Sequence, residues 1–527
     1  MGNGLERPPP WTPRKSLSSP AFNQKMSSVS LSALDALAKT RESEAYSAVD
    51  YELDQFTGLT TFHGLVRLYK ASWKFKVFWL LVICAAMGAF CYQVLQLLDM
   101  LASRPTVTEV RFNLTENGVD FPVVTICNYN SNKSGDLSLE VLEYILMSYL
   151  PMESLFDYYP NATLRRMDAA FEAYKLRHPQ FSVYSFFQAT GQKCSDMFLE
   201  CSFAGRNFPC CHYALPVMTD LGQCYQFRHF PSSNSKQYVS GVFYGLQLIL
   251  NVDRAQYAPV FLQNFFEEGF RFYVHAHGSL PYLSSGGMSI SQSTRLYASV
   301  TPLHYIFLPK DDWGDCKMDW EEQDRLDFSV DTDNISYTSS NCEAHCLSKQ
   351  FADGCGCVPL RFKTHDRYSP VCDPLQIWNC TKALGWDDDE EYWYKHCESC
   401  RLECDRWDYE VTTSYALFPN DGALHYFEQR FHLNESQVRS NIGILDLYLK
   451  EVSFREYEQM KQTSWLETLS DIGGNMGLFL GMSAITIAEI AVFLAKVAWA
   501  SSSKVSSWSS SVFEAELIFR SEGAGKL

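Results

Sequence analysis

The chain has 527 residues, 46% of them hydrophobic and 15% aromatic, which is enough apolar material for a large core and two or three domains. Its net charge of −17 argues against nucleic acid as a partner and favours the attraction of cations. It contains no GxSxG, HExxH, P-loop or Rossmann fingerprint, so we expect no enzyme activity, no resident metal and no cofactor.

The N-terminal part predicts a polar tail followed by a first membrane span. Residues 1–50 are rich in proline, serine and other polar residues, a composition typical of a mobile tail. Residues 77–98 carry no charge, and roughly 20 apolar residues are enough for a helix to cross the hydrocarbon core. Basic residues from Arg67 to Lys76 precede this run, so the positive-inside rule places residues 1–76 in the cytosol.

A second apolar segment, residues 471–497, predicts another span with Lys496 near its inner end. Residues 99–470 then lie outside the cell, and residues 498–527 form a second cytosolic tail. We therefore expect a multi-pass protein of the plasma membrane, in contact with lipid, with both termini in the cytosol.

The second span has a ridge of small residues. Gly473, Gly477 and Gly481 recur at every fourth position, so one face of a helix is open to another helix or to an ion. Asp471 and Glu489 stand at the two ends, and charges inside a membrane are costly unless they face water or a partner. Two interpretations fit this segment alone: a helix that lines a pore, and the dimer seam of a membrane anchor.

Glycosylation and cysteine patterns agree with this topology. Six Asn-x-Ser/Thr sequons all fall between the predicted spans: Asn113, Asn132, Asn161, Asn334, Asn379 and Asn434. Sixteen of the eighteen cysteines lie there too, whereas Cys84 and Cys91 lie in the first span. Pairs such as Cys355 and Cys357 have the spacing of zinc ligands, but extracellular thiols oxidise, so we expect disulfides.

The region between the spans mixes two periodicities. Alternating apolar residues predict strands at 121–126 and 237–250. Helical spacing predicts helices at 137–150 and 438–457. The sequence therefore predicts a disulfide-rich α+β extracellular domain attached to two transmembrane helices.

Several motifs together resemble the degenerin/epithelial sodium channel/acid-sensing ion channel superfamily. They follow one another in the family's order and cover both membrane segments and most of the region between them. The motifs are His63-Gly64, FPVVTICN at 121–128, WGDC at 313–316, the cysteine cluster from Cys342 to Cys404, and DIGGNMGL at 471–478.

The resemblance implies a trimer, homomeric or with partner subunits, whose ectodomain has palm, finger, thumb, knuckle and β-ball parts. It also implies a disulfide pattern in which Cys201 pairs with Cys210 or Cys211 and Cys194 pairs with the remaining one of these two. The other implied pairs are Cys127–Cys224, Cys316–Cys404, Cys342–Cys400, Cys346–Cys397, Cys355–Cys380 and Cys357–Cys372.

By the same resemblance, Gly481, Met482 and Ser483 are the selectivity filter, where backbone and serine oxygens replace part of the hydration shell of Na⁺. Met482 departs from the small residue of the family pattern at this position. The remaining assignments are the gate and outer pore at Ser470, Asp471, Gly474 and Leu478, amiloride block near Ser470, the inner pore at His63, Gly64 and Glu489, and gating coupling at Trp313.

The gating stimulus is less well defined by the residues. An acidic run, Asp387, Asp388, Asp389, Glu390 and Glu391, is read either as a site for protons or Ca²⁺ or as a solvated charged surface. Near Arg104 the palm histidine and the wrist tyrosine of acid-sensing channels are not evident. We therefore favour a small neuropeptide that docks near residues 137–205, with protons second and a constitutively open epithelial-type channel third.

Two other protein classes share part of this pattern. A two-pass adhesion receptor would explain the sequons and the disulfides, but not acids at both ends of a glycine-ridged helix. An ATP-gated receptor would share the topology, but no lysine-rich nucleotide site is evident.

Overall fold

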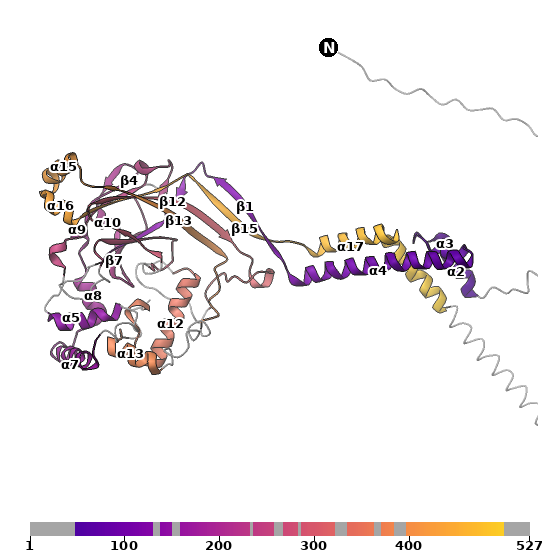
Figure 1. Ribbon diagram of the computed structural model, residues 1–527, viewed down its shortest axis with the longest axis horizontal. Helices are drawn as coiled ribbons and strands as arrows, with labels where there is room; N and C mark the ends of the chain where they lie inside the picture. The colour runs from indigo at the N-terminus through magenta and orange to yellow at the C-terminus, as the bar shows by residue number, and fades with distance from the viewer. Residues whose placement is uncertain are drawn as a thin grey trace, which may run out of the picture. The chain divides into compact units, whose positions relative to one another are not determined.

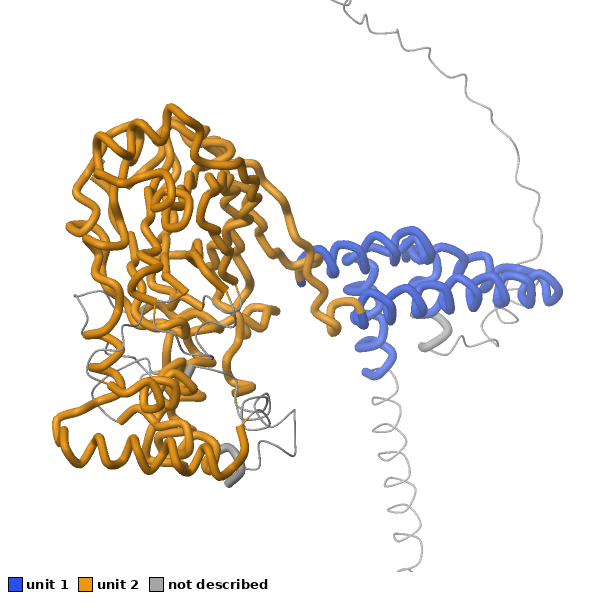
Figure 2. The backbone as a smooth tube through the Cα atoms, turned by 60° about the vertical axis from the view of Figure 1, so that its left-hand side comes forward, with its two compact units in different colours: residues 1–99, 465–527 blue, residues 100–464 orange. Residues whose placement is uncertain are grey.

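The structure is a computed structural model that describes residues 48–129, 137–149, 159–231, 235–257, 267–282, 286–321, 335–362, 370–383 and 397–499. The chain divides into two compact units, coloured separately in Figure 2. The first unit consists of residues 1–99 and 465–527, and the second of residues 100–464.

The first unit is helical in its described part. The bounds of its labelled helices are α2 Ala48–Leu59, α3 Leu65–Lys70, α4 Trp73–Ser103 and α17 Trp465–Leu480. Helix α4 is long and apolar enough to cross a membrane, and α17 together with the helix Ala484–Trp499 meets the same test as a bent pair. Helix α4 outruns the predicted 77–98 because no helix-breaking residue occurs before Pro105.

The sequence predicts that the second span starts at Asp471. Helix α17 begins six residues earlier, at Trp465, so Asp471 lies inside the helix. Residues 465–470 include polar side chains and precede the predicted apolar segment, residues 471–497. They are nevertheless helical, because a helix ends where its hydrogen bonds can no longer be made and not where its hydropathy falls.

A mixed eight-stranded sheet runs through the second unit in the order β1-β15-β12-β14-β9-β4-β5, with β13 paired to β12. Strands β1, β15, β12 and β13 are labelled in Figure 1. The strand bounds are β1 Thr106–Leu114, β4 Phe198–Phe203, β5 Arg206–Phe208, β9 Leu246–Asn251, β12 Thr294–Ile306, β13 Asp405–Leu417, β14 Ile442–Leu449 and β15 Ser453–Lys461.

A second sheet has five strands in the order β11-β10-β3-β7-β6, and a two-stranded sheet pairs β2 with β8. Their bounds are β2 Val119–Asp120, β3 Val123–Asn128, β6 Ala214–Thr219, β7 Gly222–Phe227, β8 Lys236–Gln237, β10 Phe270–His275 and β11 Met288–Ile290. The two larger sheets share one hydrophobic core, in which the rings of Phe121, Phe203 and Phe230 pack together.

Helices lie at opposite ends of this unit (Figure 1). One group has its own apolar core and comprises α5 Leu139–Leu146, η1 Met147–Tyr149, α7 Asn161–Arg177 and α8 Val183–Thr190. Beside it lie α12 Ser339–Cys355, η6 Leu360–Phe362 and α13 Pro374–Ala383. At the other end are α15 Asp421–Phe431 and α16 Glu435–Asn441. Short helical elements complete the described part: α9 Cys194–Met197, α10 Cys210–Tyr213, η2 Val242–Tyr244, η3 Arg254–Gln256 and η5 Lys310–Asp312.

The predicted elements compare unevenly with this fold. The strand at 121–126 is confirmed as β3, although β3 begins two residues later, at Val123, and ends at Asn128. The helix at 137–150 is confirmed as α5 with η1. The run 237–250 holds a strand only in part, because a 3-10 turn precedes β9.

The predicted helix at 438–457 is wrong, because α16 ends at Asn441 and the strands β14 and β15 follow. Strand β14, IGILDLYL, is buried at every residue except Tyr448. A strand that is buried on both faces loses the alternation of apolar and polar residues, so periodicity cannot distinguish it from a buried helix.

Eight disulfides lie among the described residues, and they are the pairs that the resemblance implies. Cys201 bonds to Cys210, and Cys194 to Cys211. Cys84 and Cys91 are free. The other bonds are Cys127–Cys224, Cys316–Cys404, Cys342–Cys400, Cys346–Cys397, Cys355–Cys380 and Cys357–Cys372.

Candidate functional site

The second apolar segment breaks at residues 481–483. Helix α17 ends at Leu480, the next helix begins at Ala484, and the two are bent by 72°. Gly481 occupies the left-handed region with φ +65°, and its amide donates to the Gly477 carbonyl at 3.0 Å. Glycine in this conformation closes a helix without steric strain, so the glycine ridge supplies the helix end.

His63 lies directly against this break. Its backbone N–H donates to the Leu480 carbonyl at 3.1 Å, which satisfies one of the acceptors that a helix leaves unpaired at its C-terminus. An ideal Cβ added to Gly481 would lie 1.6 Å from Nδ1 of His63. The imidazole therefore fills the space that any side chain at position 481 would need.

Neighbouring residues hold the same segment in place. Gly64 has φ +96°, and a Cβ there would lie 3.1 Å from Ile83 of α4. The hydroxyls of Thr61 and Thr486 form a hydrogen bond, and Thr486 is fully buried. Thr486 Oγ1 also accepts the amide of Ser483 at 3.0 Å. The structure thus brings together the candidate filter and the His-Gly motif, which are far apart in sequence.

The outer-pore candidates lie on the part of α17 that precedes the break. Ser470, Asp471, Gly474 and Leu478 are all exposed in the single chain, and the side chain of Leu478 is 78% exposed. Residues 470, 474 and 478 are four apart, so they share one face of the helix. An exposed apolar stripe on a candidate membrane helix faces lipid, a pore or another copy of the chain.

Glu489 lies on the helix after the break. It is half-buried, and its Oε2 has no hydrogen-bond partner within the described residues. The helix that carries Glu489 is also packed against α2, because the rings of Phe56 and Phe493 stack with their centroids 4.4 Å apart.

In the second unit, Trp313 lies in the turn after η5. It has φ +77°, and the ammonium group of Lys461, at the end of β15, lies 5.7 Å from the centroid of its ring. Lys461 also forms an ion pair with Asp312. Lys461 therefore contacts the ring of Trp313, the residue to which the resemblance assigns gating coupling.

Gln459, two residues before Lys461, joins three elements. Its Oε1 accepts the backbone amide of Leu308 at 3.0 Å, and its Nε2 donates to the Thr106 hydroxyl at 2.9 Å. Thr106 is the first residue of β1, so one side chain links β1, β15 and the segment after β12. Strand β1 follows α4 in the chain, and β15 precedes α17. These two strands therefore form the covalent connections from the second unit to both apolar helices.

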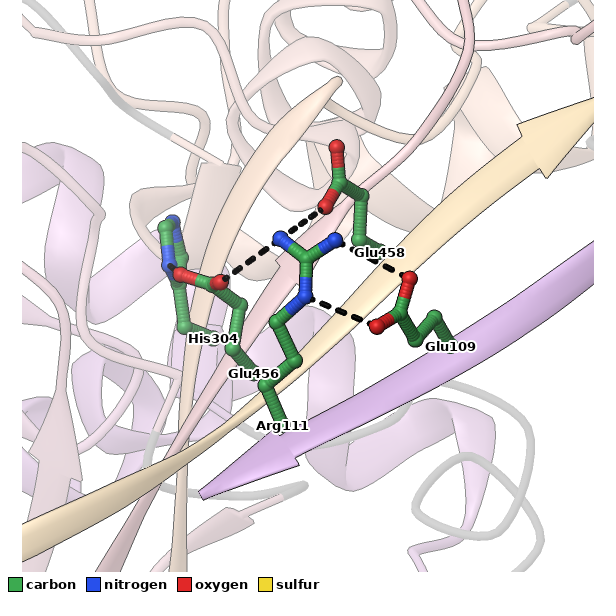
Figure 3. Close-up of polar contacts among 5 residues, drawn as sticks. All are labelled: Glu109, Arg111, His304, Glu456 and Glu458. Carbon is green, nitrogen blue, oxygen red and sulfur yellow. Dashed lines mark hydrogen bonds and ion pairs between the residues drawn. The ribbon is translucent and has the colours of Figure 1, made fainter. Parts of the chain in front are cut away.

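Charged side chains cover one face of the β1–β15 pair (Figure 3). Arg111 holds Glu109 with two hydrogen bonds of 3.0 and 2.9 Å, and its other amine lies 2.6 Å from Glu458. The hydrogen bonds from Arg111 lower the pKa of Glu109 below its ordinary value. Glu456 lies further along the same face, next to His304 of β12.

No sequence motif marks Arg111, His304, Glu456, Gln459 or Lys461 as functional. A signal was present for two of the strands, because Glu109 and Arg111 alternate with Val110 and Phe112, and Glu456 and Glu458 flank Tyr457. The acidic run at 387–391 lies outside the described residues. Within the described ranges, no group of three or more His, Cys, Asp or Glu side chains has the geometry to hold a metal ion.

Comparison with known proteins identifies the family. The family model described as "Amiloride-sensitive sodium channel" matches residues 56–493. Acid-sensing ion channel 4-B of Danio rerio is 26% identical, over 85% of this chain and 76% of that protein. The bile acid-sensitive ion channel of Homo sapiens is 27% identical, over 82% of this chain and 84% of that protein. The chain therefore belongs to the amiloride-sensitive sodium channel family.

Proposed function

We propose that this chain forms a trimeric, Na⁺-selective and amiloride-blocked channel of the plasma membrane that an extracellular ligand opens. The observation that carries the proposal is the break at Gly481, Met482 and Ser483 with His63 docked against it. A break in a membrane helix frees backbone oxygens, and such groups are tolerated at membrane depth only where they face protein or a water-filled path. Carbonyl and serine oxygens at such a site can replace the water of Na⁺.

For the stimulus we propose first a small peptide with aromatic and cationic side chains. A cavity of about 750 Å³ in the second unit has the size of typical ligand sites. None of residues 137–205, where the sequence predicts docking, lines this cavity. Its wall includes Trp407, Tyr409 and Phe454. The exposed carboxylate of Asp120 also lines it and lies 3.7 Å from Lys236, so an arginine of the peptide would compete with this lysine. Aromatic faces bind cations, and a carboxylate pairs with an arginine, so this lining suits such a peptide.

Protons are the second candidate stimulus, because several of the relatives are acid-sensing ion channels. A bile acid is a further agonist to test, since another relative is a bile acid-sensitive channel. A two-pass adhesion receptor stays as the alternative of another class.

The test is voltage clamp on cells that express the chain alone, with Na⁺ outside. Acid steps, short amidated peptides and a bile acid are applied in turn, with and without amiloride. We expect an inward current that amiloride blocks, and the stimulus that raises it identifies the agonist. The variant Ser470→Phe serves as a positive control intended to hold the pore open. No current from Ser470→Phe at normal surface abundance would contradict the proposal of a homomeric channel.

Replacing Gln459 with leucine should weaken the response to the agonist. The change removes both hydrogen bonds to Leu308 and Thr106, which together contribute about 1–2 kcal/mol. We expect the agonist concentration for half-maximal current to rise about tenfold, a factor that corresponds to 1.4 kcal/mol. Gln462→Leu is the matched control, because the bond from Gln462 to Pro105 uses its backbone amide. Equal responses from the two variants would show that Gln459 does not carry the coupling.

A further inference from the structure

A second cavity, of about 360 Å³, lies in the second unit beside the end of β10. No carboxylate occurs among its described lining residues, although the chain as a whole has 61 acidic and 44 basic residues. Its wall is apolar at Val217, Leu280 and Ile335. Its polar lining consists of hydrogen-bond donors and one charged group, and includes Gln226, Arg228, His229, His277, Ser279 and Ser336.

Arg228 is the charged group of this lining, and a buried side chain holds it. Its Nε donates to Oε1 of Gln226, which is 2% exposed. The amide nitrogen of Gln226 lies 3.3 Å from the Thr125 hydroxyl and 3.2 Å from Nε2 of His275. A guanidinium has five N–H donors in one plane, so Arg228 can hold Gln226 and bind a second acceptor at the same time.

His275 is the buried end of this hydrogen-bond chain and adds no charge to it. Burial lowers the pKa of His275 to about 3, so the imidazole is neutral. Its Nε2 accepts from the Gln226 amide, which places the ring N–H on Nδ1. This Nδ1 lies 3.0 Å from Oγ of Ser279. His275 therefore fixes Gln226 and Ser279 in place, and Arg228 alone sets the charge.

Another part of the wall is fixed by Asn341, which is fully buried in α12. Its Nδ2 donates to the carbonyls of Gly278 at 3.0 Å and Ser336 at 2.9 Å, and its Oδ1 accepts the amide of Leu280 at 2.8 Å. Gly278 has φ +79°, and a side chain there would collide with Ser336. The two lining segments are thus tied together, and the cavity is formed before any ligand enters.

His229 and His277 add two further donors at the exposed rim of the cavity. Their ring centroids lie 6.4 Å apart, and both side chains are exposed. A neutral imidazole still donates one N–H. The carboxylate of Asp120 does not line this cavity, and it lies 3.7 Å from the Lys236 ammonium group. The lining therefore presents one positive charge and several neutral donors, a combination that suits a single negative charge.

We propose that this cavity binds a small organic anion, a carboxylate on a short hydrocarbon chain, through the guanidinium of Arg228 with His229 and His277 as further donors. A carboxylate matches the planar fork of a guanidinium and brings one negative charge, whereas a phosphate group brings nearly two. The apolar wall suits the hydrocarbon, and the volume is at the small end of ligand sites. Either a free short-chain acid or the C-terminus of a peptide carries this group.

The test measures binding to the full chain purified in detergent and does not depend on channel activity. The probe is trifluorobutyrate, whose fluorine NMR line broadens when it binds, with the signal of protein-free micelles subtracted. We expect a dissociation constant of about 1 mM. Butyrate should displace the probe, whereas butyramide, which has the same shape and no charge, should not. Equal displacement by butyrate and butyramide would overturn the proposal.

Arg228→Gln should weaken binding of the probe at least tenfold, because the neutral amide loses the charge and the planar fork. Arg439→Gln is the matched control, since Arg439 is an exposed arginine that pairs with Glu435 on α16 and does not line the cavity. Binding by Arg228→Gln equal to that of Arg439→Gln would contradict the assignment of Arg228 as the anion ligand.

A second variant keeps the proposal testable if Arg228→Gln does not fold. His229 is exposed, so His229→Phe keeps a ring of similar size and removes only the donor. We expect it to weaken binding several-fold, whereas His425→Phe, at an exposed histidine that contacts Gln429, should leave binding unchanged. Equal binding by these two variants would refute the role of His229.

Two competitors distinguish the source of the carboxylate. Butyrate represents a free short-chain acid, and N-acetylvaline represents the C-terminus of a peptide. Stronger displacement of the probe by one of them supports the site and identifies the source. Failure of both to displace the probe would overturn the proposal.

Discussion

Replacing Gly481 with alanine is expected to reduce the Na⁺ current at least tenfold and to weaken Na⁺ selection in the current that remains. An alanine at φ +65° is strained by roughly 1–2 kcal/mol. Its Cβ would also lie 1.6 Å from Nδ1 of His63, so the imidazole must leave the break. The acceptor oxygens of residues 480–483 would then be held differently. Whole-cell current and the reversal potential in mixed Na⁺ and K⁺ solutions measure both effects.

Gly473→Ala is the matched control for this variant. Gly473 belongs to the same helical ridge, but its added Cβ meets nothing within 4 Å in the single chain and its φ is not positive. A double variant, Gly481→Ala with His63→Ala, removes the clash and leaves only the backbone strain, so part of the current should return. If Gly481→Ala conducts normally at equal surface abundance, the break is not the conduction site. An adhesion protein would lose only expression with any of these changes.

Replacing Asp446 with asparagine should lower the free energy of unfolding by about 3 kcal/mol. The Asp446 side chain is 1% exposed, and it accepts hydrogen bonds from Arg295 at 2.6 and 3.2 Å and from Gln247 at 2.7 Å. These bonds join β14 to β12 on one side and to β9 on the other. The neutral amide would leave the Arg295 guanidinium without its counter-ion at the centre of the sheet. Thermal unfolding and surface biotinylation measure the loss.

The surface pair Asp408 and Arg406 provides the control for Asp446. Asp408 is half exposed and 3.8 Å from Arg406, so Asp408→Asn should change the free energy of unfolding by less than about 0.5 kcal/mol. A double variant, Asp446→Leu with Arg295→Met, replaces the ion pair with apolar groups and should recover part of the loss. Equal stability of Asp446→Asn and Asp408→Asn would show that the ion pair does not hold the three strands together.

Composition and local patterns alone predicted those features of this protein that depend only on residues adjacent in sequence. The hydropathy of residues 77–98 does not depend on the rest of the fold, so hydropathy alone predicted the first apolar helix. Cysteine content together with sequons predicted a disulfide-rich ectodomain, and the family resemblance supplied the pairing that spacing alone leaves open. Gly481 could be singled out from the sequence because glycine recurs at every fourth position from Gly473 to Gly481.

Tertiary structure decided which distant residues meet. His63 and Gly481 lie at opposite ends of the chain, and only the fold places the imidazole in the space that the missing side chain leaves. The two carboxylates that contact His304 lie on two other strands. Asp405 lies on β13, which pairs with β12 in antiparallel orientation, and Glu456 lies on β15, which pairs with β12 in parallel orientation. The strand β14 was misread as helix because burial on both faces of a sheet removes the alternation that marks a strand. Hydrophobic periodicity reflects the environment of one segment only. Strand register and packing decide which segments contact each other, and the break at residues 481–483 with His63 against it depends on such a contact.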